Sequence, residues 1–226
     1  MIKRLKKVLK REKLKYPYKS SVIILIDRLI QIISKRSENL IISIKKDSTF
    51  KSMDDLFMCS LFPKKVLDIV IKELKPKSVL DVGCGIGNSL QYYLSNDIDA
   101  WGVENSRIAI SESPVKERII KYNLKKRLNL KKKFDLVWCF EVVEHIHPDF
   151  EHIFLSTLTN HSNKILISAA KPGQGGHGHF NEKPAEYWIE KFRQRGFQYD
   201  NSFTLKVRAT LETHSENLLF FINESV

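Results

Sequence analysis

Short runs of apolar and β-branched residues alternate with helical stretches from Lys77 to the end of the chain. Alternation of this kind is typical of an α/β fold, in which helices cover both faces of a mostly parallel sheet. Seven strands are expected, over residues 78–82, 100–103, 118–122, 134–140, 164–169, 197–200 and 218–222. The helices expected between them cover residues 87–95, 107–112, 150–160 and 185–194.

The part of the chain before Lys77 has a different pattern. Apolar residues recur at helical spacing among lysines and arginines over residues 1–15, which predicts a basic amphipathic helix that Pro17 ends. A second apolar helix is expected over 21–34, and Pro63 opens a further one. The pattern divides the chain into three parts: a basic amphipathic arm (1–20), a helical N-terminal extension (21–59) and an α/β domain (60–226).

Charge is distributed unevenly along the chain. Lysine and arginine number 38 against 26 acidic residues, a net charge of +12, and residues 1–20 alone hold +8 of it. The basicity is therefore mainly a property of the arm. Two interpretations stay open: the arm docks its apolar edge on the body of the protein, or it binds an anionic surface, either lipid headgroups or nucleic acid.

Composition narrows the class of protein. Apolar residues make up 42% of the 226 residues and charged residues 28%, which excludes wholesale disorder. No uncharged apolar run approaches 18 residues, so no transmembrane segment and no secretory signal are predicted. The three cysteines lack a CxxC spacing and indicate a reducing compartment. We therefore expect a cytoplasmic protein, peripheral at a membrane if the arm binds lipid.

A glycine-rich loop follows the first expected strand of the domain. The segment Ser78–Asn88 reads SVLDVGCGIGN, in which glycines alternate before a helix begins. Glycine permits positive φ and lets a ligand approach the backbone, and the helix start offers unpaired N–H groups. A dinucleotide-binding loop would need Gly or Ala at position 88, where Asn88 stands, so a nicotinamide oxidoreductase is disfavoured.

The spacing D-x-G-x-G-x-G resembles motif I of class I S-adenosylmethionine-dependent methyltransferases, and the resemblance runs from about residue 60 to the C-terminus. It implies a Rossmann-like sheet, an enzyme and S-adenosylmethionine as cofactor. By this resemblance the methionine part of the cofactor is held by Asp81, Gly83, Cys84, Gly85 and Gly87. The further contacts that it implies are Glu104 and Asn105 at the ribose, Asn123 and Leu124 at the adenine, and Phe140 and Glu141 beside the cofactor.

The fourth expected strand carries the second informative motif, which reads FDLVWCFEVVEH over residues 134–145 and resembles the fourth-strand motif of the same family. Glu141, Glu144 and His145 are spaced i, i+3 and i+4. If the turn after the strand is helical, this spacing puts all three side chains on one face.

Three interpretations of these residues stay open. His145 could be a general base near the methyl acceptor, oriented by Glu144. The motif also resembles the metal half-site of magnesium-dependent O-methyltransferases, including those acting on small-RNA 3′ ends and on ubiquinone precursors. His179, from the glycine-rich loop 172–182, would complete that site, so Glu141, Glu144, His145 and His179 could hold Mg²⁺ or another divalent metal. The third interpretation is purely structural.

The acceptor of the methyl group is the least determined part of the function. The predicted reaction is O-methylation of a hydroxylated small molecule, saccharide or lipid-linked acceptor, with His145, Glu144 and His179 as catalytic residues. A metal-dependent RNA 2′-O-methyltransferase is the alternative. A scaffold that binds S-adenosylmethionine without catalysis is the alternative from another class.

Overall fold

The computed structural model describes residues 62–224. The predicted arm and N-terminal extension, residues 1–59, lie outside these described residues. No helix within the described part is long and apolar enough to cross a membrane.

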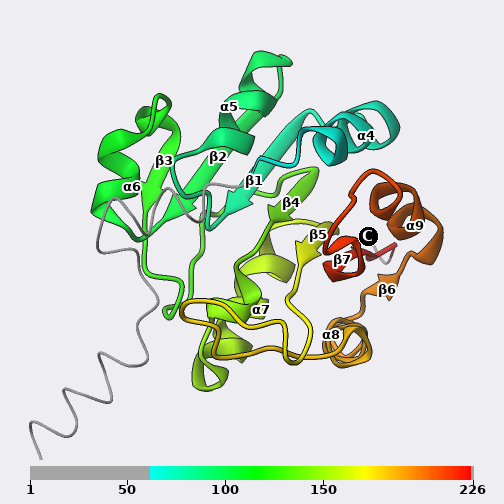
Figure 1. The fold of residues 1–226 in the computed structure, drawn as a ribbon. Coiled ribbons are helices and arrows are strands. Elements are labelled where there is room, and N and C mark those ends of the chain that lie inside the picture. The colour runs from blue at the N-terminus through cyan, green and yellow to red at the C-terminus, as the bar shows by residue number, and fades with distance from the viewer. Residues whose placement is uncertain (1–61, 225–226) are drawn as a thin grey trace, which may run out of the picture. The chain divides into compact units, whose positions relative to one another are not determined.

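Seven strands form one sheet in the order β3-β2-β1-β4-β5-β7-β6 (Figure 1). All neighbours pair in parallel except β7, which is antiparallel to both β5 and β6. This is the Rossmann-like, mostly parallel sheet that the alternating pattern predicted. The strands are β1 (Ser78–Val82), β2 (Asp99–Glu104), β3 (Ile119–Lys121), β4 (Leu136–Cys139), β5 (Lys164–Ser168), β6 (Gln198–Tyr199) and β7 (Leu218–Ile222).

Helices cover both faces of the sheet. In the order of the chain they are α4 (Lys64–Leu74), α5 (Asn88–Ser95), α6 (Arg107–Glu112), α7 (Glu151–His161), α8 (Ala185–Arg193) and α9 (Asn201–Arg208). Short 3₁₀ helices connect them: η2 (Lys116–Arg118), η3 (Val143–His145), η4 (Pro148–Phe150) and η5 (Ser215–Asn217). Figure 1 shows α4 and α5 on the opposite side of the sheet from α7.

Successive strand residues feed two separate cores because side chains alternate across a sheet. In β4, Leu136 and Trp138 pack with apolar residues of α4, α5 and α9, whereas Val137 and Cys139 pack with those of α7 and α8. Strands buried on both faces read as nearly continuous apolar runs, which explains why β1, β4 and β7 were visible in the sequence.

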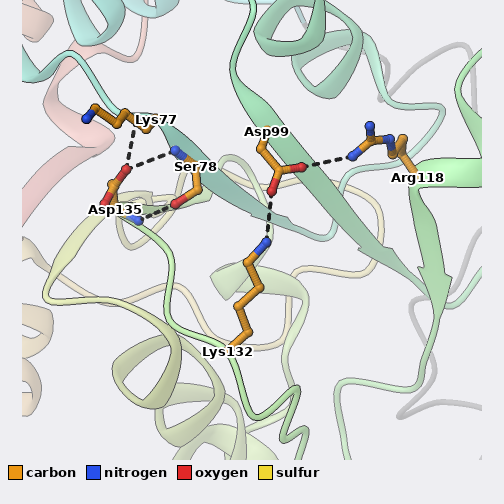
Figure 2. A network of polar contacts seen from close by, with 6 residues as sticks. All are labelled: Lys77, Ser78, Asp99, Arg118, Lys132 and Asp135. Atoms are coloured by element: carbon orange, nitrogen blue, oxygen red, sulfur yellow. Dashed lines mark hydrogen bonds and ion pairs between the residues drawn. The ribbon is translucent and has the colours of Figure 1, made fainter.

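Four expected strands are shorter in the structure, of which the fifth (164–169) and the sixth (197–200) lose only end residues in β5 and β6. The fourth was expected over 134–140 but β4 begins at Leu136, because Phe134 forms only an isolated bridge to Ser162 and Asp135 turns its carboxylate to the backbone of β1. Asp135 accepts hydrogen bonds from the amides of Lys77 and Ser78 at 2.8 and 2.9 Å (Figure 2). The third was expected over 118–122 and comprises 119–121.

The helix α9 was not predicted. It is eight residues long and opens at Asp200, whose carboxylate accepts a hydrogen bond from the Phe203 amide at 2.9 Å. Phe203 and Val207 are its buried apolar residues, one turn apart. Two apolar positions are too few to make a helical period stand out in a sequence.

Candidate active site

A pocket of about 620 Å³ opens at the carboxyl ends of the parallel strands. Ligands of doubly wound sheets bind at this edge, where the direction of strand order reverses between β1 and β4. The pocket is lined by Gly83, Glu104, Asn105, Asn123, Leu124, Lys125, Glu141, Val142, His145 and Ile146. Six of these belong to the predicted cofactor set, and His145 belongs to the predicted catalytic set.

The glycine loop has the backbone conformation that only glycine adopts easily. Gly83, Gly85 and Gly87 have φ of 81°, 56° and 83°. A Cβ on Gly83 would lie 2.6 Å from Val142, so the loop packs too tightly there for any side chain. A Cβ on Gly85 would meet nothing within 4 Å. The loop therefore packs against the protein at Gly83 and leaves free space at Gly85. A ligand has room to lie there against the backbone of the loop.

Glu104 closes β2 and is buried beneath this loop. One carboxylate oxygen accepts the amides of Asn105 and Ser106 at 2.7 Å each, and the other accepts the amide of Gly85 at 3.1 Å. Burial raises the pKa of Glu104, while these three donors lower it. A carboxylate offers about four lone-pair sites, so a ribose that brings two hydroxyls would compete with the Gly85 amide.

Asp81 is the second buried acid of the loop. Its pKa is raised to about 8, first by burial and then by the negative charge of Glu104. The nearby hydroxyl of Tyr93 is also buried, and it makes no hydrogen bond within residues 62–224. A carboxyl group in this state is suited to meeting a cation, because an ammonium group would restore its ionised form.

The remaining predicted cofactor residues differ in what they offer. Asn123 lines the pocket, but its side-chain oxygen already accepts the Lys125 amide at 2.9 Å, which leaves its NH₂ group for a ligand. Cys84 packs its sulfur toward Gly102 of β2, so it offers only backbone. Phe140 stacks on Trp138 with ring centroids 5.5 Å apart and is not part of the pocket wall. The spacing of these residues in the sequence could not predict which of their side chains are available to a ligand.

Three of the four predicted metal ligands come together. Glu144, His145 and His179 each place one ligand atom within 4.8 Å of the others. Glu144 is completely buried, and among residues 62–224 no N–H or hydroxyl group donates to its carboxylate oxygens, whereas the Glu141 carboxyl lies close enough to share a hydrogen bond with it. Burial and the neighbouring Glu141 hold its pKa well above the usual range. Buried carboxylates without a donor are rare, and this one lies beside two imidazoles, which is the donor set of a divalent metal.

Hydrogen bonds orient both imidazoles. His145 Nδ1 lies 3.2 Å from the Gly178 carbonyl, and His179 Nδ1 lies 2.8 Å from the Glu182 carboxylate. We assign the proton to Nδ1 in each ring, which puts the lone pair on Nε2. A carboxylate behind a histidine is the usual arrangement around metal-binding imidazoles. Glu182 itself is held by the amides of Gly173 and Gly175 at 2.8 and 2.7 Å.

The spacing had suggested that Glu141 shares a helical face with Glu144 and His145 if the turn is helical. The structure does not place them on one face. β4 ends at Cys139, Glu141 has a left-handed backbone with φ of 54°, and only Val143–His145 form a single 3₁₀ turn. The Glu141 carboxylate lines the pocket and accepts a hydrogen bond from the Ser168 hydroxyl. It is therefore a neighbour of the three-residue cluster and is separate from it.

The loop that carries His179 is attached to the core. The amides of Phe180 and Asn181 donate to the Glu144 carbonyl at 2.8 and 3.0 Å. The Asn181 side chain donates to buried Glu151 of α7 at 3.0 Å, and Tyr187 of α8 donates to the same carboxylate. These bonds bring His179 to Glu144 across 35 residues of sequence. His177, two residues earlier, is exposed.

Sequence reasoning missed Ser168, Glu182 and Lys125 at this site. It also missed a signal that was present in the sequence: residues 116–133 hold nine basic side chains and one acidic one. Lys125 of this segment lines the pocket. The charge count over the whole domain concealed the segment, because acidic residues elsewhere offset it.

Residues 56–207 match the protein family described as a methyltransferase domain. The match spans more than half of the chain, so the chain belongs to that family. A search among curated proteins found no match.

Solved structures of similar fold include three methyltransferases. The sugar N-methyltransferase KedS8 from Streptoalloteichus sp ATCC 53650 is 14% identical, with a TM-score of 0.60 over 78% of this chain and 94% of that one. Magnesium protoporphyrin IX methyltransferase from Synechocystis PCC 6803, with bound SAH, is 17% identical, with a TM-score of 0.54 over 72% and 82%. The methyltransferase domain of bacterial CtHen1-C is 18% identical, with a TM-score of 0.53 over 71% and 96%.

The fold, the glycine loop and the family match together define the class of protein. The chain is a class I S-adenosylmethionine-dependent methyltransferase, and S-adenosylmethionine is its cofactor. These findings favour an enzyme over the non-catalytic scaffold.

Proposed function

We propose that the enzyme methylates a hydroxyl group of a small molecule, saccharide or lipid-linked acceptor with the help of a divalent metal. The observation that carries this proposal is the buried Glu144 carboxylate, which meets no N–H or hydroxyl donor among residues 62–224 and lies within one ligand cluster with His145 and His179. Glu141 is close enough to raise the pKa of Glu144 and could add a fourth ligand, a second carboxylate oxygen.

The donor set fits such an ion. Two carboxylates and two imidazoles suit Mg²⁺ and also admit manganese, zinc or iron, so the chemistry leaves the identity of the metal open. A bound cation would lower the pKa of an acceptor hydroxyl. It would also stabilise the ionised form of Glu144, whose pKa is otherwise raised by burial and by the neighbouring Glu141.

The protein's own task is alignment. The sulfonium methyl group of the cofactor is already activated, so catalysis depends on holding the acceptor oxygen in line with the methyl group and the sulfur. Gly83 of the glycine loop and Glu104 line the same pocket as Glu141 and His145. We expect the cofactor to lie against the glycine loop and Glu104, and the acceptor to lie against the cluster.

A metal-free mechanism is the second candidate, and one observation favours it. Burial and the neighbouring His179 lower the pKa of His145 to about 4. The ring is therefore neutral at pH 7, and its lone pair can accept a proton from an acceptor hydroxyl, but a pKa of about 4 makes it a weaker base than a free imidazole.

Metal titration separates the two candidates. Isothermal titration of the chelator-treated enzyme with Mg²⁺, Mn²⁺ and Zn²⁺ should show one site that His145→Ala and Glu144→Gln weaken by about tenfold or more, as loss of a ligand requires. Titration with S-adenosylmethionine should give unchanged affinity for both variants. Exposed His152→Ala and Glu212→Gln are the matched controls.

The outcomes are distinct. Binding of no divalent metal, together with turnover that a chelator leaves unchanged, would contradict metal assistance and favour His145 as base. Loss of cofactor affinity in His145→Ala with normal turnover per bound complex would remove the cluster from the acceptor side altogether.

A further inference from the structure

One wall of the pocket is a segment without regular secondary structure. Asn123, Leu124 and Lys125 line the pocket, and they lie in the connection between β3 and β4. Residues 122–135, all within the described part of the chain, form neither a helix nor a strand of the sheet. No continuous ladder of backbone hydrogen bonds therefore fixes this wall, and its position depends on individual contacts.

The first half of the connection is tied to β2 and to itself. The Tyr122 amide donates to the Glu104 carbonyl at 2.9 Å, and the Tyr122 hydroxyl donates to the Arg127 carbonyl at 2.8 Å. The Asn123 side-chain oxygen accepts the Lys125 amide at 2.9 Å. These bonds define the shape of the wall, and its second half, which returns to β4, needs an attachment of its own.

That attachment depends on a buried histidine. The Leu130 amide donates to Nε2 of His161 at 3.0 Å. His161 is the last residue of α7 and is 1% exposed. Its Nδ1 lies 2.6 Å from the Thr157 carbonyl, and its own carbonyl accepts the Phe134 amide at 2.7 Å. One residue of α7 therefore holds both ends of the stretch 130–134.

These contacts assign a task to each nitrogen of the His161 ring. A carbonyl can only accept a hydrogen bond, so Nδ1 carries a proton toward Thr157, and Nε2 keeps the lone pair that the Leu130 amide needs. A side chain without an acceptor at the position of Nε2 would leave the Leu130 amide unpaired. An unpaired, partly buried amide favours a shift of the segment toward water.

The turn beside this hydrogen bond also needs support from its surroundings. Lys131 has a left-handed backbone, with φ of 49°, and its amide donates to the Asn129 side-chain oxygen at 2.9 Å. This conformation is costly for a residue with a side chain. Buried Leu128 precedes the turn, and Lys132, which follows it, pairs with Asp99 at 2.8 Å (Figure 2). The turn is thus held on the core side and at the surface.

We propose that His161 is a positioning residue for the cofactor. Through the Leu130 amide it keeps the pocket wall in place, although His161 itself does not line the pocket. The apparent affinity of a ligand falls in proportion to the fraction of molecules whose site is in place. Loss of the acceptor at His161 should therefore weaken cofactor binding. This role concerns the cofactor alone and depends on neither the metal nor the methyl acceptor.

Two substitutions separate the two ring nitrogens. His161→Asn puts an amide where Nδ1 lies and leaves no acceptor for the Leu130 amide, whereas His161→Gln reaches the position of Nε2 and keeps one. Titration calorimetry of the full chain with S-adenosylhomocysteine should show about fivefold or more weaker binding in His161→Asn. Binding in His161→Gln should stay within about twofold of the wild type. Rescue by glutamine distinguishes positioning from packing, because both substitutions remove the ring.

A core substitution away from the pocket wall is the matched control for stability. Val207 of α9 is completely buried in the core on the other face of the sheet from α7. Val207→Ala should lower the midpoint of thermal unfolding, because it removes buried methyl groups. It should leave cofactor affinity unchanged at temperatures well below that midpoint.

Hydrogen exchange in the wild type tests the same link without a variant. If cofactor binding needs the wall in place, bound cofactor must in turn disfavour opening of the segment, because coupling between two sites is reciprocal. S-adenosylhomocysteine at about 100 times its Kd should slow exchange of the Leu130 amide by about tenfold or more. The amide of Ala209, at the end of α9, should exchange at an unchanged rate.

Four results would overturn this role of His161. The first is equal cofactor affinity in the wild type and His161→Asn. The second is equal weakening by His161→Asn and His161→Gln, which would indicate packing alone. The third is weakening by Val207→Ala as large as that by His161→Asn, which would indicate a general loss of stability. The fourth is exchange of the Leu130 amide that bound S-adenosylhomocysteine leaves unchanged.

Discussion

At the residue scale, the most informative side chain is Asp81. It is buried at the end of β1 against Glu104, and both burial and that neighbouring acid raise its pKa to about 8. The sulfur and hydroxyl groups that face it, Cys84, Cys139 and Tyr93, have pKa values raised by the same burial. Asp81 is therefore mostly protonated at pH 7 before the cofactor arrives.

Cofactor binding should consequently be linked to a proton. If the ionised Asp81 attracts the ammonium group of S-adenosylmethionine, Asp81 must lose its proton on binding at any pH below about 8. Affinity should then rise with pH up to 8, by up to about tenfold per unit. Calorimetry in buffers of different ionisation enthalpy, at pH 6 and 7, should count about one proton released.

The variant Asp81→Asn supplies the control. Its cofactor affinity should be lower than that of the wild type at pH 8, and it should release fewer protons at pH 6 to 7. Glu104, whose pKa is also raised, remains in this variant and accounts for any residual release. Wild-type affinity that stays constant from pH 6 to 8 would contradict the assignment of Asp81 to the ammonium group.

At the element scale, the sequence predicted the strands of the sheet and the glycine loop, but it did not predict helix α9. Strand runs such as β1 and β7 are apolar on both faces, and this pattern survives in a single sequence. The glycine loop was equally predictable, because its positive φ values require glycine and the glycines are visible in the sequence. In contrast, α9 has only two buried apolar residues, and its helical state depends on Thr204, whose hydroxyl accepts the Phe220 amide from β7.

The sequence predicted which residues gather on the acceptor side of the pocket, but it did not predict how they are arranged. Spacing alone suggested that Glu141 stacks with Glu144 on a helix, whereas a left-handed residue and a 3₁₀ turn separate them. The approach of His179 to Glu144 depends on Asn181 and Glu151, a contact between segments 30 residues apart. Tertiary contacts of this kind leave no local signal in a sequence.

The glycines of the loop before α8 allow a test of this geometry. A Cβ on Gly176 would lie 2.4 Å from Nε2 of His179, the nitrogen that would face a metal. Gly176→Ala should displace the imidazole and weaken divalent-metal affinity by about 10- to 100-fold, as other changes around metal ligands do. Titration of the chelator-treated variant with Mn²⁺ measures this directly.

Gly173→Ala is the matched control for that substitution. Gly173 also has a positive φ, of 81°, so alanine is strained there as well, but its Cβ would meet nothing within 4 Å. Both variants should lose about 1 kcal/mol of folding free energy, and only Gly176→Ala should lose metal affinity. Equal metal affinity in the two variants would show that His179 is not a ligand.

At the scale of the whole molecule, charge is divided between two basic segments and a slightly acidic remainder. Residues 1–20 and residues 116–133 carry +8 each, and the rest of the chain carries −4. The two segments differ in apolar content. The first has Ile2, Leu5, Val8 and Leu9 at helical spacing, whereas the leucines of the second are buried in the domain. Basic residues interspersed with apolar residues at helical spacing are typical of peripheral membrane binding.

We therefore propose that the arm binds an anionic membrane surface. Replacing Lys3, Lys6, Lys7 and Lys10 by Gln in the full chain should weaken binding to phosphatidylserine vesicles by more than about tenfold, since each basic residue near such a surface contributes about 1 kcal/mol. Cofactor affinity should stay unchanged. A control with four Gln substitutions elsewhere, at Lys65, Lys72, Lys164 and Lys183, should bind vesicles as the wild type does. Vesicle binding that the arm variant retains would contradict the proposal, and a loss confined to RNA binding would instead assign the arm to nucleic acid.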